Sequence, residues 1–345
     1  MSSPKQRKET EGGITSPSLS SFASVPERVS HVIGIDVGGT KIAAGLVAFP
    51  EGRAITKRMA PTQPTRGGRA VLDDVLRLAR ELAAEAGKIG VPIEAVGLGV
   101  CELVDRDGRL ASANCIPWLD QPVHEVLSAI APVTIEADVR AAALAEGLFG
   151  AAKSFHNFLY VTVGTGISCC LMLEGQPYLG ARGATGTMGS SPISVPCEQC
   201  GHVSQRTLEE IAAGPALVAR FNALHGSATR GQDVLTAAAN GNAVAAQIVR
   251  TAGGALESQL GLLVNVLDPE AVVIGGGLGL SEGPFWDEFI AATRRRIWSE
   301  MHRDLPMLRA ATGADAGWIG AAAKAWKTSL HVEANTNCNH PKQSS

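Results

Sequence analysis

The stretch VIGIDVGGTKIAAGLV places a carboxylate, two glycines, a hydroxyl and a cation close together, as Asp36, Gly38, Gly39, Thr40 and Lys41. Glycine lets backbone N–H groups approach an anion closely and adopts the positive φ angles that such turns need. The threonine hydroxyl adds a donor, the lysine can offset phosphate charge, and the aspartate can hold Mg²⁺ through water. These residue types therefore favour phosphate binding.

Two further glycine turns follow apolar runs. They are Gly164, Thr165 and Gly166 in VTVGTGIS, and Gly275, Gly276 and Gly277 in VVIGGGL. Each turn alone is more simply interpreted as a tight turn, but three in one chain favour a shared nucleotide site. The Walker pattern G-x-x-x-x-G-K-[ST] is absent. The GGGLGL segment does not match G-x-G-x-x-G and comes too late in the chain to open a Rossmann domain.

The composition limits the classes of partner. The chain has 345 residues, 45% of them hydrophobic, which is enough for two domains with cores. A net charge of −3 gives no electrostatic basis for nucleic acid binding. No apolar run has the length of a membrane span or the form of a secretory signal, and seven scattered cysteines suit reduced thiols. We therefore expect a cytoplasmic protein that binds neither nucleic acid nor membrane.

Strand and helix patterns alternate along the chain, which predicts the α/β class. A hairpin of two strands encloses the first glycine turn, and a second strand–turn–strand unit encloses the next, which suggests two similar domains. Predicted strands cover residues 32–37, 42–47, 95–100, 131–137, 158–173 and 271–275, and predicted helices cover 69–86, 138–150, 207–225, 232–267 and 317–327.

Five motifs, in the same order along the chain, resemble those of the ROK family of sugar kinases, transcriptional repressors and related open reading frames. They are IGIDVGGTKIAAGLV, IEADVRAAALAE, VTVGTGIS, VVIGGGL and GWIGAAAKA. The resemblance implies a two-lobed, actin-like (ribonuclease H-like) ATPase fold. We expect residues 31–137 plus 317–328 to form an N-terminal lobe and residues 138–316 a C-terminal lobe. The polar ends, residues 1–30 and 329–345, are predicted to be disordered tails.

The resemblance also implies an activity and a partner. The three glycine turns would bind ATP with Mg²⁺, and Asp138 matches the catalytic aspartate that accepts the proton of the attacking sugar hydroxyl. Relatives are often homodimers, so a homodimer is expected. Without the resemblance, Asp138 is more simply interpreted as the N-cap of the helix that follows it, because aspartate is a favoured N-cap residue.

The acceptor site departs from the family pattern. Ala137 stands where the family's hexose kinases carry Asn, and GTMGS replaces their G-E-x-G-H segment. A Cys-Glu pair stands in place of Pro-Gly, so that a new carboxylate either meets the acceptor or faces solvent. The expected substrate residues are Glu102, Asn114, Thr187, Ser190 and Glu209. We predict a modified sugar rather than glucose.

The family's zinc motif is also degraded. The segment CEQCGHVSQRT keeps Cys197 and Cys200, and His202 is a third candidate ligand. No fourth ligand is visible beside them, so we expect no stoichiometric zinc.

Two other functions compete with an ATP-dependent sugar kinase. A sensor or regulatory protein that binds nucleotide or sugar without catalysis would explain the lost acceptor residues. Residues 1–30 are too short and polar for a helix-turn-helix domain. A dinucleotide-linked oxidoreductase is disfavoured by the order of the motifs.

Overall fold

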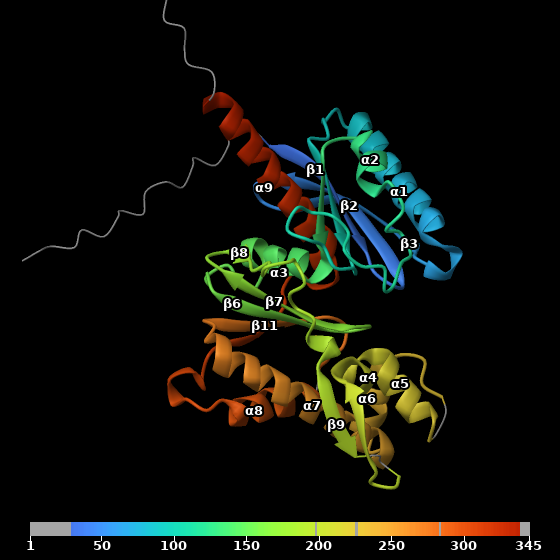
Figure 1. Cartoon of the computed structure of the whole chain (residues 1–345), viewed down its shortest axis with the longest axis vertical. Coiled ribbons are helices and arrows are strands. Elements are labelled where there is room, and N and C mark those ends of the chain that lie inside the picture. The colour runs from blue at the N-terminus through green and yellow to red at the C-terminus, as the bar shows by residue number, and fades with distance from the viewer. Residues whose placement is uncertain (1–28, 197–198, 225–226, 283, 339–345) are drawn as a thin grey trace, which may run out of the picture.

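The computed structural model describes residues 29–338, except for residues 197–198, 225–226 and 283. Within these residues the chain forms two five-stranded mixed sheets with helices packed on them, one above the other in Figure 1. This arrangement confirms the α/β class. Most of the tail expected at residues 1–30 lies outside the described residues, but Ser30 already begins the first strand.

The first sheet has the strand order β3-β2-β1-β4-β5. Its strands are β1 (Ser30–Val37), β2 (Lys41–Phe49), β3 (Arg53–Pro61), β4 (Ala95–Val100) and β5 (Val133–Ala137). The predicted hairpin is confirmed, because β1 and β2 pair antiparallel across the first glycine turn. The strands β1, β4 and β5 run parallel. Their carboxyl ends therefore lie along one edge of the sheet.

Helices cover both faces of this sheet (Figure 1). They are α1 (Gly68–Lys88), the short α2 (Val123–Ser128) and α9 (Ala316–Cys338). The helix α9 lies very close to the strands, because a Cβ atom on Gly34 would come within 1.9 Å of the Trp318 carbonyl oxygen. A Cβ on Gly97 would come equally close to the Ala321 carbonyl oxygen. Glycine at these two positions therefore sets the spacing between sheet and helix.

The second sheet has the order β12-β11-β6-β7-β8. Its strands are β6 (Phe158–Val163), β7 (Ile167–Leu173), β8 (Gln176–Pro177), β11 (Ala271–Gly275) and β12 (Met307–Arg309). The second strand–turn–strand unit is confirmed by the antiparallel pairing of β6 and β7. The helix α3 (Asp138–Phe149) lies between the two sheets in Figure 1.

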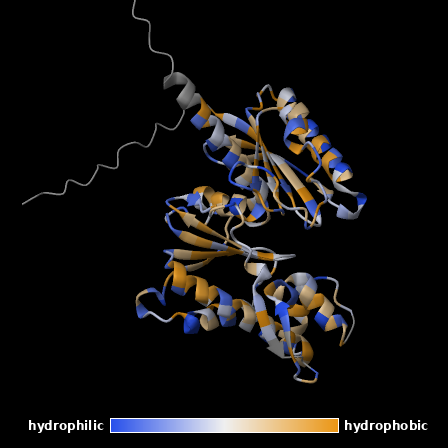
Figure 2. Cartoon of the chain, viewed as in Figure 1, coloured by the Kyte–Doolittle hydropathy of each residue, from blue (hydrophilic) through white to orange (hydrophobic). Residues whose placement is uncertain are grey.

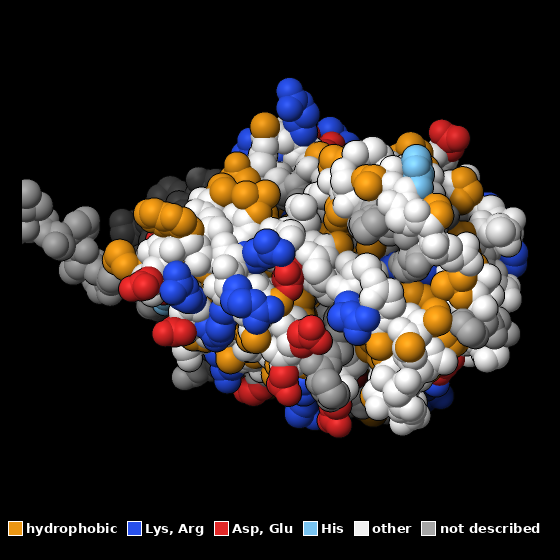
Figure 3. All heavy atoms as spheres, turned by 90° about the horizontal axis from the view of Figure 1, so that it is seen from below, with side chains coloured by type: hydrophobic (Ala, Val, Ile, Leu, Met, Phe, Trp, Pro, Cys, Tyr) orange, Lys and Arg blue, Asp and Glu red, His pale blue; other side chains and the backbone are white. Residues whose placement is uncertain are grey.

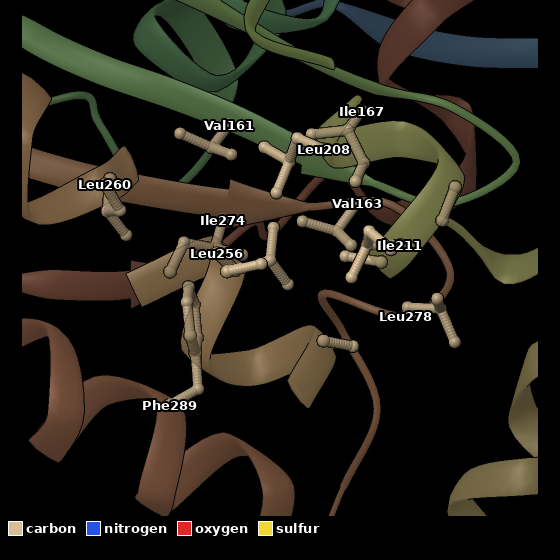
Figure 4. Close-up of a cluster of buried hydrophobic side chains, with 14 of the residues drawn as sticks. Val161, Val163, Ile167, Leu208, Ile211, Leu256, Leu260, Ile274, Leu278 and Phe289 are labelled. Carbon is tan, nitrogen blue, oxygen red and sulfur yellow. The ribbon is translucent and has the colours of Figure 1, made fainter. Parts of the chain in front are cut away.

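The remaining helices pack mostly on the other side of the second sheet. They are α4 (Leu208–Ala212), α5 (Gly214–Asn222), α6 (Gly231–Ala239), α7 (Ala243–Leu267) and α8 (Pro284–Arg296), with a hairpin of β9 (Pro192–Pro196) and β10 (Val203–Thr207) beside them. Short 3-10 helices are η1 (Pro64–Arg66), η2 (Met188–Ser190), η3 (Glu300–His302) and η4 (Gly313–Asp315). Figure 4 shows the buried side chains that join β6 and β11 to these helices, among them Val161, Ile274 and Leu256. Figure 2 shows that the strands of both sheets are mainly hydrophobic.

Three details differ from the sequence-based expectation. The helix α9 continues to Cys338, well past the expected end at residue 328. The helix α3 begins at Asp138, with Ala137 as its N-cap, so the aspartate occupies the first turn rather than the cap. The helices α2 and α8 and the strands β3, β8, β9, β10 and β12 were not predicted. No helix among the described residues is long and apolar enough to span a membrane.

Candidate active site

The register of the parallel strands brings three polar segments to one edge of the first sheet. Val37 pairs in register with Val100, and Val100 pairs in register with Ala137. The residues that follow each strand therefore start at the same level, with neighbouring strands about 4.8 Å apart. The first glycine turn, the segment containing Glu102, and Asp138 are neighbours for this reason.

The first glycine turn is closed by its own backbone. The Gly38 N–H donates to the Lys41 carbonyl oxygen over 3.0 Å. The Thr62 hydroxyl donates to the Gly38 carbonyl oxygen over 2.6 Å, and the Thr62 N–H donates to the Thr40 carbonyl oxygen. Thr40 and Lys41 are exposed. Hydrogen bonds from Thr62 thus fix the backbone of the turn, and Thr40 and Lys41 remain exposed to solvent.

The second and third glycine turns are in contact with each other. A Cβ atom on Gly164 would lie 3.5 Å from the Gly277 nitrogen. The Val163 carbonyl oxygen accepts the Leu278 N–H over 2.9 Å, which ties the end of β6 to the turn after β11. Gly276 has a φ of 83°, which favours glycine over any residue with a side chain. The two turns form one continuous backbone surface, on which Thr165 is exposed.

Asp138 is half-buried at the start of α3, and its Oδ1 accepts the Val139 N–H over 2.6 Å. Burial raises the pKa of Asp138 to about 6, because an ionised carboxylate loses water there. The Val139 N–H opposes this rise, the negative charge of Glu102 adds to it, and Arg140 opposes it. A carboxyl group with such a pKa can accept a proton near neutral pH.

Asp36 is the second half-buried carboxyl group at this edge. Burial raises its pKa to about 7, the charge of Asp138 adds to the rise, and Lys41 opposes it. The effect of Asp138 on Asp36 shows that the two carboxyl groups share one electrostatic environment. A bound cation would lower the pKa of Asp36, because it would favour the ionised form.

Glu102 lies close to these groups, but its side chain turns into its own loop. It is 3% exposed, and its carboxylate accepts hydrogen bonds from residues 112–116. Asn114 on the same loop is exposed. The prediction that Glu102 contacts an acceptor therefore stays a prediction, and the observed contacts give its carboxylate a role inside the loop.

The other expected substrate residues lie beside the second glycine turn. Glu209 accepts the Ile167 N–H at Oε2 over 2.9 Å. The same oxygen lies 2.9 Å from the position that a Cβ on Gly189 would occupy, which places Glu209 next to η2. Thr187, Ser190 and Glu209 are all exposed. Glu209 therefore lies beside the second glycine turn and next to η2, the short helix that Thr187 precedes and Ser190 ends.

Arg140 lies beside the site, although none of the sequence motifs pointed to it. It is 1% exposed and pairs with Glu136 through an Nε–Oε1 distance of 2.6 Å. Its guanidinium also donates to the Val104 carbonyl oxygen over 2.8 Å and to the Gly183 carbonyl oxygen over 3.0 Å. Arg140 thus links the loop after β4 to the loop after β8. The signal that could have found it was a single arginine among the small and apolar residues 139–145 of the helix.

The candidate zinc ligands are only partly described. Cys197 lies outside the described residues, whereas Cys200 and His202 are exposed between β9 and β10. In the portion of the chain that the structure describes, no group of three His, Cys, Asp or Glu side chains could hold a metal ion. The expectation about zinc therefore stays a prediction.

Known proteins are similar to this chain in sequence and in overall fold. The glucokinase of Streptomyces coelicolor is 30% identical over 317 residues, covering 84% of this chain and 96% of its own. The kanosamine kinase of Amycolatopsis mediterranei is 30% identical over 300 residues, covering 85% and 95%. The structure of a ROK glucokinase from Streptomyces griseus, in complex with glucose and AMPPNP, superposes with a TM-score of 0.71 at 30% identity, covering 86% of this chain and 100% of that one.

These similarities cover most of the chain, so the two-lobed, actin-like ATPase fold that the motifs implied is confirmed. The ROK family model matches residues 32–328, and the chain belongs to the ROK family.

Proposed function

We propose that this protein is an ATP-dependent sugar kinase in which Asp138 is the general base. The observation that carries the proposal is the register of Val37, Val100 and Ala137, which lie side by side at the carboxyl ends of β1, β4 and β5. Because of it, a glycine turn of phosphate-binding type and a carboxyl group with a pKa of about 6 lie two strands apart, roughly 10 Å. A kinase needs such a pair, since the phosphate and the proton acceptor must flank one hydroxyl.

The nucleotide would bind between the two sheets. The backbone N–H groups of the three glycine turns would hold the phosphates, and Thr40 and Thr165 would add hydroxyl donors. The exposed ammonium of Lys41 would balance phosphate charge. The contact of the second and third turns supports one site for both of them. The proposed ATP residues are Asp36, Gly38, Gly39, Thr40, Lys41, Gly164, Thr165, Gly166, Gly275, Gly276 and Gly277.

Asp138 would accept the proton of the acceptor hydroxyl as its oxygen attacks the γ-phosphorus of ATP. One O–P bond forms, and the bond from that phosphorus to the β,γ-bridging oxygen breaks. The products are the phosphorylated sugar, ADP and a proton held first by Asp138. The raised pKa of this residue suits the role, because a base works best when its pKa lies near the working pH.

Asp36 fits a Mg²⁺ ion that accompanies ATP. Its carboxyl group offers hard oxygen ligands, and its pKa is raised even though Lys41 opposes the rise, so a divalent cation would find a carboxylate that lacks a strong partner. Bound magnesium would neutralise charge that develops on the phosphate oxygens. This chain would supply the Asp36 carboxylate to the ion. Gly317 lies against that carboxylate and, having no side chain, leaves room for it.

The acceptor proposed here is a sugar other than glucose. Ala137, Thr187 and Ser190 offer smaller and less polar contacts than the Asn, Glu and His that the family's hexose kinases carry. Relatives of this chain include kinases named for glucose and for kanosamine, so acceptors differ among similar proteins. The polar side chains that remain for the acceptor are Asn114, Thr187, Ser190 and Glu209.

The deciding experiment is ADP release with a panel of hexoses, amino sugars, N-acetyl sugars and polyols. Asp138→Asn should reduce turnover at least ~1000-fold while nucleotide affinity is retained, because only the proton acceptor is lost. Asp73→Asn is a matched control on the exposed surface of α1 and should behave as wild type. The acid limb of kcat/KM should fall near pH 6, as Asp138 becomes protonated.

A regulatory protein without catalysis is the second candidate, favoured by the same replacements at Ala137, Thr187 and Ser190. ATP binding without phosphate transfer to any sugar would support it and contradict the kinase.

We also propose a cytoplasmic homodimer, for which size-exclusion chromatography with light scattering is the test of the dimer. The face seen in Figure 3 mixes acidic and basic side chains, which gives nucleic acid no basic surface there.

A further inference from the structure

Glu102 is a carboxylate buried at the edge where the active site is proposed. It comes two positions after β4 ends and is 3% exposed. Glutamate is seldom buried so completely unless it is paired, because an ionised group without partners is costly to desolvate. Its partners therefore indicate what it does.

The partners are consecutive backbone N–H groups of one loop. Oε1 accepts the N–H groups of Cys115 and Ile116 over 2.6 and 2.9 Å. Oε2 accepts the Asn114 N–H over 2.8 Å and the Ser112 hydroxyl. Ser112 in turn accepts the Leu103 N–H at its Oγ over 2.9 Å. The carboxylate thus accepts hydrogen bonds from four groups of the loop formed by residues 112–116.

This loop is held against the first glycine turn. A Cβ atom on Gly39 would lie 2.9 Å from the Cys115 sulfur, so the loop and the turn are in contact. Downstream, Ile116 and Trp118 are fully buried and anchor the chain. Asn114 comes directly before Cys115 and is exposed.

Hydrogen bonds to a charged acceptor are stronger than neutral ones, and several on one group act together. Three N–H groups directed at one carboxylate fix the backbone dihedrals of the residues that carry them. A loop fixed in this way does not have to be ordered when a substrate binds, which lowers the cost of binding.

We propose that Glu102 is the positioning residue of the acceptor site: its carboxylate holds residues 112–116 against the first glycine turn and so presents Asn114 to the acceptor beside Asp138. The claim that the loop presents Asn114 to the acceptor, the acceptor half of the proposal, rests on the proposed sugar kinase function. The claim that Glu102 holds the loop, the loop-holding half, stands on the hydrogen bonds alone. Glu102 acts through the loop and touches no reacting atom.

The test compares Glu102→Gln and Glu102→Asp with a matched control, Glu270→Gln. Glu270 accepts the N–H groups of His156 and Asn157 over 2.7 and 2.6 Å, but it lies at the opposite end of the strands of the second sheet. Binding of a non-hydrolysable ATP analogue with wild-type affinity is the control that each of the three variants is folded. Hydrogen exchange is measured on the protein alone, in the peptides that span residues 110–117 and 154–159.

Glu102→Gln should speed exchange at residues 110–117 by ~10-fold or more, because the amide replaces a charged acceptor and directs a donor at backbone donors. Glu102→Asp keeps the charge with a shorter reach and should fall between it and wild type. Glu270→Gln should speed exchange only at residues 154–159. Wild-type exchange at residues 110–117 in Glu102→Gln would overturn the proposal.

Kinetics separate positioning from general damage. With glucose, and with the sugar of highest turnover in the ADP-release panel, Glu102→Gln should raise the acceptor KM by ~10-fold and leave the ATP KM within about twofold. An equal rise in both KM values would overturn the acceptor half. If wild type phosphorylates no sugar but Glu102→Gln still frees residues 110–117, the loop-holding half stands and the kinase function falls.

Discussion

The carboxyl group of Asp36 lies against the backbone of Gly317 at the start of α9. A Cβ atom added to Gly317 would come within 2.4 Å of Asp36 Oδ2 and 2.5 Å of its carboxyl carbon. Only glycine fits there without moving one of the two partners. The first strand of the sheet and the last helix of the fold therefore meet at the carboxyl group that we propose to serve the nucleotide.

Gly317→Ala should displace Asp36 and weaken the use of ATP. We expect kcat/KM for ATP to fall by ~10-fold or more, since a displacement of about 1 Å in a positioned group has effects of this size or larger. Gly254→Ala is the control, because nothing lies within 4 Å of a Cβ at that position of α7. That variant should keep its ATP kinetics and gain slightly in stability. Unchanged kinetics in Gly317→Ala would show that Asp36 has no part in the site.

Asp36→Asn should stabilise the ligand-free protein in a pH-dependent way. The folded-state pKa of about 7 lies above the ordinary value of 3.8, so the folded protein holds the proton more tightly than the unfolded chain. The contribution of Asp36 to the free energy of unfolding is therefore complete below about pH 4 and is lost as the pH rises towards 7. The Tm difference between variant and wild type should grow over this window and then level off. A Tm difference that stays constant from pH 4 to 7 would contradict a raised pKa of Asp36 in the folded protein.

Two adjacent glycines in the third turn should behave differently. Gly276→Ala forces a side chain onto a φ of 83° and within 2.4 Å of the Val163 carbonyl oxygen, so it should lower the Tm without any ligand. Gly277 has nothing within 4 Å of its Cβ position. Gly277→Ala should keep the Tm but bind ATP more weakly, because the new methyl group would take up space that the proposed phosphates need. Equal ATP affinity in Gly277→Ala and wild type would exclude this turn from the nucleotide site.

Glucose should be a poor acceptor. Each hydrogen bond that a buried sugar site fails to make costs on the order of 1–3 kcal/mol, so two independent replacements reduce kcat/KM by at least ~100-fold relative to a dedicated glucokinase. Steady-state ADP release with glucose measures this directly, and Thr187→Glu combined with Ser190→His should recover part of the activity. Efficient glucose phosphorylation at micromolar KM would contradict an altered acceptor.

The purified protein should carry less than stoichiometric zinc. Only Cys197 and Cys200 remain of the three cysteines in the family motif, with His202 as a further candidate. Elemental analysis of protein purified without chelators is the measurement, with Cys101→Ser as a control thiol outside the motif. One equivalent of zinc that disappears in Cys200→Ser would show the prediction to be wrong.

The sequence predicted the parts of the fold that repeat a local pattern. The hairpin around Gly38 and Gly39, the unit around Gly164 and Gly166, and the strand before Gly275 are all found as expected. In each case an apolar run of strand length ends at glycine, and both signals are local. Asp138 could be placed at a strand end because the strand pattern of residues 131–137 is followed at once by a helical pattern.

The missing parts depend on contacts between distant segments. The strand β3 is mostly exposed and carries Lys57, Arg58 and other polar residues, so its alternation was hidden, and pairing with β2 determines its structure. The role of Glu102 depends on N–H groups more than ten positions away, which no spacing rule anticipates. The far end of α9 lacks a glycine or proline that would have predicted where it ends, and its composition resembles a polar tail.

The placement of α9 has a consequence for synthesis on the ribosome. The first sheet is complete in sequence at Ala137, yet the face with Gly34 and Gly97 is covered by residues that begin at Ala316. At about 5–20 residues per second, the chain between them takes on the order of ten seconds or more to emerge. During that interval the apolar face has no helix to cover it, so the nascent chain should be a target for chaperones that bind exposed hydrophobic strands.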